Sequence, residues 1–177
     1  MSMSPEVFQH DFDRDGLSLK LKVKLSADQS AVDPVVRKIM HVVREMDCAT
    51  GKEDAIELAL TEALANAIVH GAKSDPSKSV ECDVACEQKA GMLIVVRDPG
   101  QGFDPTKIPS PLVGQNIYSS HGRGIFLINQ LMDDVKFHKN GTEIHMIKRL
   151  APAGRKARSP RKTGKNSKPR SSRQRSR

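Results

Sequence analysis

With 177 residues, of which 37% are hydrophobic and 28% charged, the chain is long enough to bury one core and polar enough for a water-soluble domain. It has no Trp and a single Tyr, which argues against a surface built to stack nucleic-acid bases. No stretch is long and apolar enough to span a bilayer, and the N-terminus lacks the apolar run of a signal peptide, so we expect a cytoplasmic protein with no membrane partner.

The net charge of +8 is unevenly distributed along the chain. Eleven of the 29 Lys and Arg residues lie in residues 151–177, which contain no acid, and the remaining 18 basic and 21 acidic residues give the rest of the chain a net charge of −3. We therefore predict an N-terminal extension over residues 1–16, a folded domain over residues 17–150 and a disordered basic tail over residues 151–177. The tail is either solvated or binds nucleic acid nonspecifically.

The folded part begins with a strand and an amphipathic helix. Residues 17–25 alternate strictly between aliphatic and polar side chains, and the lysines on the polar face suit an edge strand or a solvent-facing surface. Apolar residues then recur at helical spacing up to about residue 47.

A second helix is predicted over residues 52–72, with Gly71 as its left-handed terminating residue. It is apolar on almost every side, yet Glu62 and Asn66 lie one turn apart on one face. A carboxylate and an amide in an apolar arc cost free energy unless they have a partner. That partner is either a hydrogen-bonding group in the core or a ligand.

The remaining elements follow in a regular order. A continuous apolar run at residues 92–97 is typical of a central strand buried on both faces, and Asn140-Gly141 predicts a hairpin turn. A long loop is expected over residues 105–121 and a third helix after it. Further strands are expected at residues 79–87, 134–139 and 142–149. This order predicts an α+β fold, a two-layer sandwich in which three helices cover one face of a mixed, mostly antiparallel sheet.

The three cysteines, Cys48, Cys82 and Cys86, do not have the spacing of a metal site. Cys82 and Cys86 fall on one face of the strand at residues 79–87. We interpret them as small buried hydrophobic side chains.

Two glycine-rich segments complete the candidate site. Asp98, Gly100 and Gly102 directly follow the buried strand, where a carboxylate can accept a hydrogen bond from an exocyclic amine and glycines allow close approach of a ligand. The second segment, Gly122-Arg123-Gly124, opens the third helix, whose N-terminal N–H groups favour an anion.

In this order and spacing, three segments resemble the nucleotide-binding motifs of the GHKL ATPase superfamily. EALANAIVHG resembles the N-box, DPGQGFD the first glycine box and HGRGIFLI the second. The compact domain looks most like the anti-sigma-factor serine/threonine kinases of bacterial partner-switching systems. The resemblance covers roughly residues 17–149 and implies the GHKL, or Bergerat, ATPase fold.

The resemblance also implies roles for individual residues, with ATP and Mg²⁺ as cofactors. Glu62 would be the catalytic residue, either as general base or by orienting the attacking water or hydroxyl, and Asn66 would be the Mg²⁺ ligand. Asp98 would bind the adenine amine in a pocket shaped by Gly100 and Gly102, with Thr142 nearby. The phosphates would rest on Gly122, Arg123 and Gly124 under a lid formed by residues 105–121. His70, one turn beyond Asn66, is interpreted as a structural partner near the helix end.

The function implied is an ATP-dependent kinase that binds a sigma factor and phosphorylates an anti-sigma-factor antagonist, which regulates transcription. A homodimer is a further implication of the resemblance. Two alternatives remain open at this point. One is a module that binds ATP or ADP without catalysis, and the other is a nucleic-acid-associated protein that acts through residues 151–177.

Overall fold

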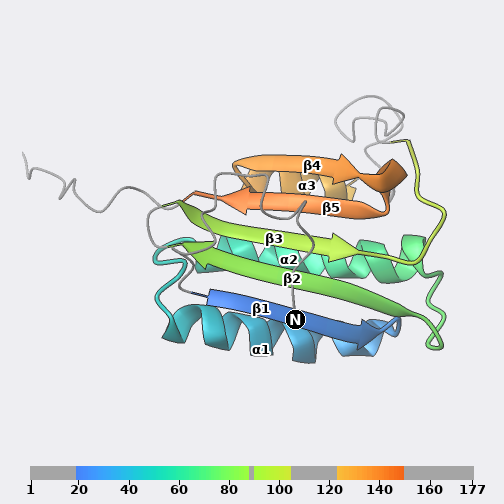
Figure 1. Cartoon of the computed structure of the whole chain (residues 1–177), viewed down its shortest axis with the longest axis horizontal. Helices are drawn as coiled ribbons and strands as arrows, with labels where there is room; N and C mark the ends of the chain where they lie inside the picture. The colour runs from blue at the N-terminus through green and yellow to red at the C-terminus, as the bar shows by residue number, and fades with distance from the viewer. Residues whose placement is uncertain (1–18, 88–89, 105–122, 150–177) are drawn as a thin grey trace, which may run out of the picture.

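The computed structural model describes residues 19–87, 90–104 and 123–149. Within these ranges five strands form one sheet in the order β1-β2-β3-β5-β4. The strands are β1 (Leu19–Ser26), β2 (Ser79–Glu87), β3 (Gly91–Arg97), β4 (Asp134–His138) and β5 (Glu143–Lys148). Each neighbouring pair of described strands is antiparallel, so the sheet is antiparallel throughout these ranges rather than mixed (Figure 1).

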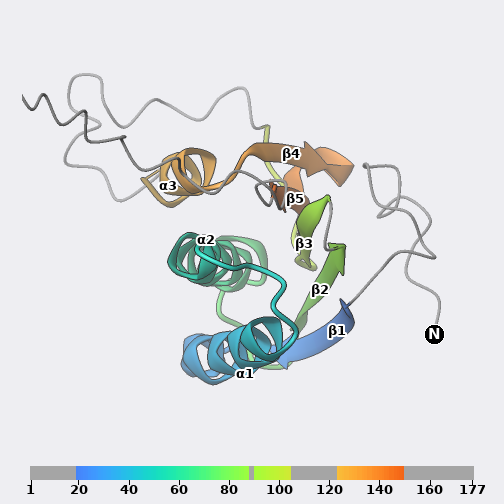
Figure 2. The ribbon, with the colours of Figure 1, turned by 90° about the vertical axis from the view of Figure 1, so that its left-hand side faces the viewer.

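Three α-helices cover one face of this sheet. They are α1 (Val32–Glu45), α2 (Glu53–Asn66) and α3 (Arg123–Leu131). Figure 2 shows all three on the same side of the strands, which leaves the opposite side of the sheet without a helix among the described residues. The predicted two-layer α+β architecture is confirmed.

The core lies between the two layers. On α2, Ile56, Leu60 and Leu64 are fully buried at the spacing of one helix face, and they belong to the same apolar cluster as Met92 and Ile94 of β3. Burying one such side chain stabilises the fold by about 1.5–3 kcal/mol. Every residue from Met92 to Val96 is at most 1% exposed, which confirms the prediction of a central strand.

β1 is an edge strand, and its two faces differ as the alternation predicts. Leu19, Leu21 and Val23 pack against the core, whereas the intervening lysines Lys20, Lys22 and Lys24 are exposed on the other side. Exposed lysines on an edge strand discourage pairing with another chain.

The end of the second helix differs from the prediction. The α-helical part, α2, ends at Asn66. It is followed directly by a π-helical turn, η3 (Ala67–Gly71), whose end is marked by the hydrogen bond from Ala72 N–H to Ala67 O at 2.8 Å. Gly71 is not left-handed; Lys73 and Ser74 adopt positive φ angles of 62° and 52° instead. π-Turns inside helices are frequent at functional sites, and this one directly follows Asn66.

The cysteines behave as predicted. Cys48, Cys82 and Cys86 are free thiols and fully buried. Burial raises the pKa of Cys82 to about 12, so this thiol stays protonated and unreactive at neutral pH.

Several predictions concern residues outside the described ranges and remain predictions. They are the extension over residues 1–16, the lid over residues 105–121, the position of Gly122 and the tail over residues 151–177. Among the described helices, none has the length and apolarity needed to cross a bilayer.

Candidate functional site

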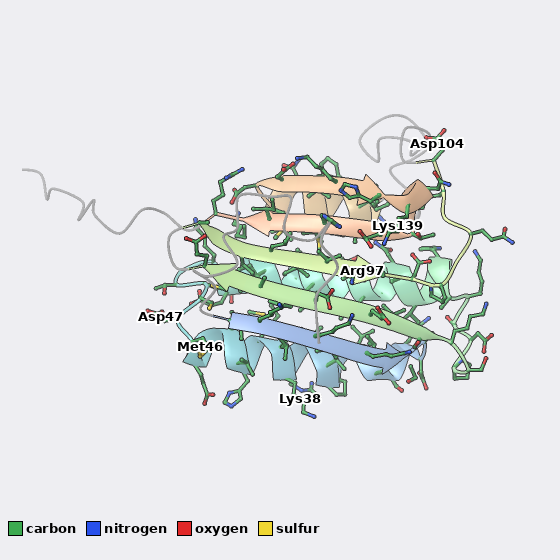
Figure 3. All side chains as sticks on the ribbon, viewed as in Figure 1. Lys38, Met46, Asp47, Arg97, Asp104 and Lys139 are labelled. Atoms are coloured by element: carbon green, nitrogen blue, oxygen red, sulfur yellow. The ribbon has the colours of Figure 1, made fainter. Side chains whose placement is uncertain are left out.

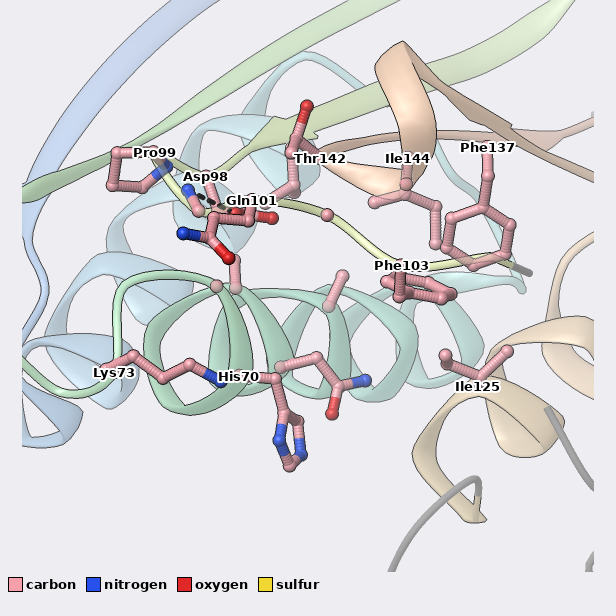
Figure 4. A pocket seen from close by; sticks show the side chains of 18 of the residues that line it. His70, Lys73, Asp98, Pro99, Gln101, Phe103, Ile125, Phe137, Thr142 and Ile144 are labelled. Carbon is pink, nitrogen blue, oxygen red and sulfur yellow. Dashed lines mark hydrogen bonds between the residues drawn. The ribbon is translucent and has the colours of Figure 1, made fainter. Parts of the chain in front are cut away.

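A cavity of about 800 Å³ opens between the C-terminal part of α2, the ends of β3 and β5, and α3. Five of the residues predicted from the sequence line it: Asn66, Asp98, Gly100, Gly102 and Thr142. Figure 4 shows the cavity with Asp98 and Thr142 on one side and Phe103, Phe137 and Ile125 on another. Segments that are far apart in sequence therefore contribute to one site.

Asp98 is held at the end of β3 by two hydrogen bonds. Its backbone N–H donates to Thr142 O at 3.0 Å, which ties the end of β3 to the start of β5. Its carboxylate oxygen Oδ1 accepts from Gly100 N–H at 2.8 Å, drawn as a dashed line in Figure 4. Oδ2 has no hydrogen-bond partner among the described residues and is available to accept from a ligand.

The environment of Asp98 raises the pKa of its carboxyl. Burial is the largest cause, because a half-buried carboxylate loses part of its hydration. The hydrogen bond from Gly100 and the charge of Lys73 act in the opposite direction but do not cancel this effect. A carboxylate in an apolar pocket, with one oxygen open, suits recognition of an amine donor on a flat heterocycle.

Positions 71 and 100 must be glycine because neither leaves room for a Cβ atom. A Cβ placed on Gly71 would collide with the Asp98 carboxyl group, and one on Gly100 would stand 2.6 Å from Gly71 O. The end of the π-turn and the loop after β3 therefore approach more closely than any side chain allows.

Gly102 and Gly141 have a different requirement, because both are left-handed, with φ angles of 78° and 84°. Phe103 N–H donates to Asn140 O at 2.8 Å, which joins the loop after β3 to the turn η6 (Lys139–Gly141). A Cβ on Gly141 would stand 2.6 Å from Phe103 O. These contacts fix the second wall of the cavity.

Glu62, Asn66 and Gly124 meet at the other end of the site. The position that a Cβ on Gly124 would occupy is 2.7 Å from Glu62 Oε2 and 3.0 Å from Asn66 Nδ2. The start of α3 therefore packs directly on the polar pair of α2. Asn66 lines the cavity, whereas Glu62 and Gly124 stand beside it and Arg123 is exposed at the first residue of α3.

The sequence did not indicate most of the apolar wall or the nearby cations. Phe103 and Phe137 pack edge to face with ring centroids 5.3 Å apart, and Ile125, Ile128 and Ile144 line the same region. Lys73 and Lys78 also line the cavity. Phe137 alternates with exposed Lys136 in β4, which was a usable signal for its direction. The lysines lie in an irregular loop, where no pattern marks them.

His70 lines the cavity near the end of η3 and is exposed. In Figure 4 its imidazole ring points away from Asp98 and Thr142.

Sequence comparison identifies the family to which this site belongs. A family model described as the histidine kinase-like ATPase domain matches residues 25–148, which is more than half of the chain. The chain belongs to the histidine kinase-like ATPase family. The matched region includes α1, α2, α3 and all the described residues of the cavity.

Curated relatives of this ATPase domain are similar over most of their length. An anti-sigma F factor from Bacillus cytotoxicus is 29% identical over 114 residues, which cover 62% of this chain and 77% of the relative. A protein named serine-protein kinase RsbW from Bacillus cereus is 26% identical over 136 residues, which cover 73% of this chain and 84% of the relative. An anti-sigma F factor from Heyndrickxia coagulans is 27% identical over 120 residues, which cover 64% of this chain and 81% of the relative.

Membership in the ATPase family implies that the domain binds ATP. The described residues contain no cluster of three or more His, Cys, Asp or Glu side chains that could hold a metal by themselves. Mg²⁺ bound together with nucleotide needs only one or two protein ligands, because phosphates and water supply the rest. The amide oxygen of Asn66 at the cavity wall is a suitable ligand of this kind.

Proposed function

We propose that the protein is an ATP-dependent serine/threonine protein kinase that binds a sigma factor and phosphorylates an anti-sigma-factor antagonist. The observation that carries this proposal is the contact of Gly124 with Glu62 and Asn66. It brings a carboxylate, an amide and a helix N-terminus together at one end of a cavity whose other end holds Asp98.

The adenine end of the proposed site is formed around Asp98 and Thr142. The exocyclic amine of adenine donates to Asp98 Oδ2, and the flat ring occupies the space bordered by Gly100, Gly102 and Thr142. Apolar side chains that line the cavity exclude water from this end. Exclusion of water strengthens the hydrogen bond to Asp98.

The phosphate end of the proposed site uses the start of α3. Backbone N–H groups at Gly122, Arg123 and Gly124, together with the positive end of the helix dipole, bind the phosphates. Gly124 has no Cβ, so the helix can approach Glu62 and Asn66 closely. Mg²⁺, held by Asn66, supplies neutralisation of the phosphate charge.

The proposed role of Glu62 is that of the base. As the γ-phosphoryl group passes from ATP to a Ser or Thr hydroxyl and ADP leaves, the Glu62 carboxylate would accept the hydroxyl proton. We place the acceptor hydroxyl on another protein, the antagonist. The relatives named as an anti-sigma F factor and a serine-protein kinase support a sigma factor as a partner and a protein serine as the acceptor.

The test is phosphoryl transfer from γ-labelled ATP and Mg²⁺ to a purified antagonist encoded in the same genome. We expect the wild type to label the antagonist on Ser or Thr. Glu62→Gln should lower the transfer rate by about 10²–10⁴-fold, since this is the usual contribution of a general base. ATP affinity should change little, because Glu62 lies outside the cavity wall.

Glu57→Gln is the matched control, because Glu57 lies on the same helix and pairs with Arg44 instead. It should leave transfer unchanged. Transfer by Glu62→Gln at the wild-type rate would refute the catalytic role. ATP binding by the wild type without transfer to any antagonist would instead select a non-catalytic nucleotide switch.

A further inference from the structure

The side of the sheet away from the helices, here called the outer face, carries a buried apolar patch. Ala85, Leu93, Val95 and Ile147 are between 0% and 4% exposed and form a cluster separate from the main core. In a two-layer sandwich the face without helices is normally polar and solvated. Apolar burial on this face indicates a surface that is covered in the folded protein.

An ionic cluster whose carboxylates are buried borders the patch (Figure 3, with Arg97 and Lys139 labelled). Arg97 bridges Asp83 Oδ2 at 2.5 Å and Glu143 Oε2 at 2.6 Å, and Glu143 also contacts Lys139 Nζ at 2.9 Å and His145 Nε2 at 2.7 Å. Two atoms of this cluster are left over. Asp83 Oδ1 and Arg97 Nη2 are buried without a hydrogen-bond partner among the described residues.

Asp83 Oδ1 is an unpaired acceptor and Arg97 Nη2 an unpaired donor, so an N–H and a C=O of a covering peptide can bind to them. A buried polar atom without a partner costs about 1–3 kcal/mol, so an extended peptide that satisfies both atoms gains free energy here. The surface therefore fits a segment with apolar side chains and a free backbone.

The register of the sheet places the lysines of β1 beside the patch. Lys20 lies opposite Ala85, which lies opposite Leu93, which lies opposite Ile147. The next two positions of β1 on this face are Lys22 and Lys24. A covering segment should carry acidic residues where it passes β1 and apolar residues where it passes the central strands.

We propose that residues 1–18 of this chain fold back over the outer face and cover the patch. This segment enters β1 at Leu19, in the row of the sheet next to Lys20 and Ala85. It contains Val7, Phe8 and Phe12 among four acidic residues and one Arg. Gly16 supplies the freedom for a reversal just before β1.

Length and charge both favour this occupant. Eighteen residues reach about 60 Å when extended, whereas β1 to β5 spans three strand spacings of about 4.8 Å each. The other terminal segment, residues 151–177, has eleven basic residues and no acid. The lysines of β1 would repel it.

The test uses the full chain with Val7, Phe8 and Phe12 each changed to Ser. We expect Tm to fall by several degrees, because three buried apolar side chains are removed from a domain of this size. Binding of the dye ANS should rise as the patch becomes exposed. The matched control changes Ala151, Ala153 and Ala157 to Ser and should leave both readouts unchanged.

A double-mutant cycle ties the segment to the patch. In a Val95→Ala background the N-terminal substitutions should lower Tm by less than in the wild type, because contacting sites are not additive. If Val95→Ala does not fold, Tm and dye binding of the N-terminal variant alone decide. A second variant, in which Asp11, Asp13 and Asp15 are changed to Asn, tests the electrostatic contribution. The decrease in Tm that it causes should become smaller as the salt concentration is raised.

Two results would overturn the proposal. One is an unchanged Tm and unchanged dye binding after the three N-terminal substitutions. The other is a wild-type dimer by light scattering that Leu93→Lys dissociates while the N-terminal substitutions have no effect; this would assign the outer face to a second copy of the chain.

Discussion

In the proposed site, recognition of the adenine base depends most on Asp98, because one of its carboxylate oxygens is bound to Gly100 and the other is open. In Asp98→Asn the amide oxygen can keep the bond to Gly100, which turns the NH₂ group toward the adenine amine. Two donors then face each other. Hydrogen bonds to charged groups contribute about 1.5–3 kcal/mol, so ATP affinity should fall about 10–100-fold.

Calorimetric titration with ATP measures this effect, and circular dichroism verifies that the fold is kept. Asp33→Asn, on the exposed first turn of α1, is the matched control and should bind ATP as the wild type does. Equal affinities of Asp98→Asn and the wild type would remove Asp98 from the site.

For single residues, the sequence located polar side chains of the cavity but did not show why glycine is needed at particular positions. Asn66 and Asp98 both line the cavity. Asn66 was singled out because a polar group in an apolar arc needs a partner, and Asp98 because a carboxylate at the end of a buried strand can accept a hydrogen bond from an amine. Gly71 was expected to be left-handed, whereas it is required because a Cβ would strike the Asp98 carboxyl group. Packing between distant segments leaves no periodic signal. For the same reason Lys73 was missed.

At the scale of elements, the packing of α3 on α2 depends on Gly124. Glycine to alanine near a helix start ordinarily stabilises the helix or leaves it unchanged. Here the new Cβ would push on Glu62 Oε2 and Asn66 Nδ2, which are ends of flexible side chains. Gly124→Ala should therefore keep Tm within a few degrees but displace both groups and lower phosphoryl transfer about tenfold or more.

Thermal unfolding and the labelled-ATP assay measure the two effects on the same protein. Gln130→Ala, on the exposed side of α3, controls for substitution in the helix and should keep full transfer. Wild-type transfer in Gly124→Ala would mean that α3 and α2 do not need this close approach.

Helices and strands could be predicted where the pattern of apolar residues that marks them is local in the sequence. Alternation located β1 and β2, and a continuous apolar run located β3 with its central position. The change from α2 to the π-turn η3 could not be predicted, because residues 67–71 read as ordinary helix. Their geometry depends on packing against the loop after β3, which holds Gly100 against Gly71. The order in which β5 inserts between β3 and β4 is likewise nonlocal.

At the scale of the whole molecule, the ionic cluster of the outer face predicts acid sensitivity. Burial alone would raise the pKa of Glu143, but hydrogen bonds from Lys139, His145 and Arg97 lower it from 4.5 to about 2. A carboxyl whose pKa is lower in the folded state stabilises the fold above its unfolded pKa. This contribution, up to about 3 kcal/mol, is lost as the pH falls from about 4.5 to 2.

Denaturant unfolding at pH values between 7 and 2 measures this loss. Glu143→Gln should be less stable than the wild type at pH 7, and the difference between the two should narrow over the same acid range. A constant difference in unfolding free energy from pH 7 to pH 2 would show that Glu143 is not held ionised by its neighbours.

The most direct test of the nucleotide site is an ATP titration with and without Mg²⁺ on the full chain and on Asn66→Ala. The wild type should bind ATP more tightly when Mg²⁺ is present, because the Asn66 oxygen and the phosphates hold the ion together. Asn66→Ala should bind ATP with little dependence on Mg²⁺. Equal Mg²⁺ dependence in both proteins, or no ATP binding by the wild type, would contradict the account.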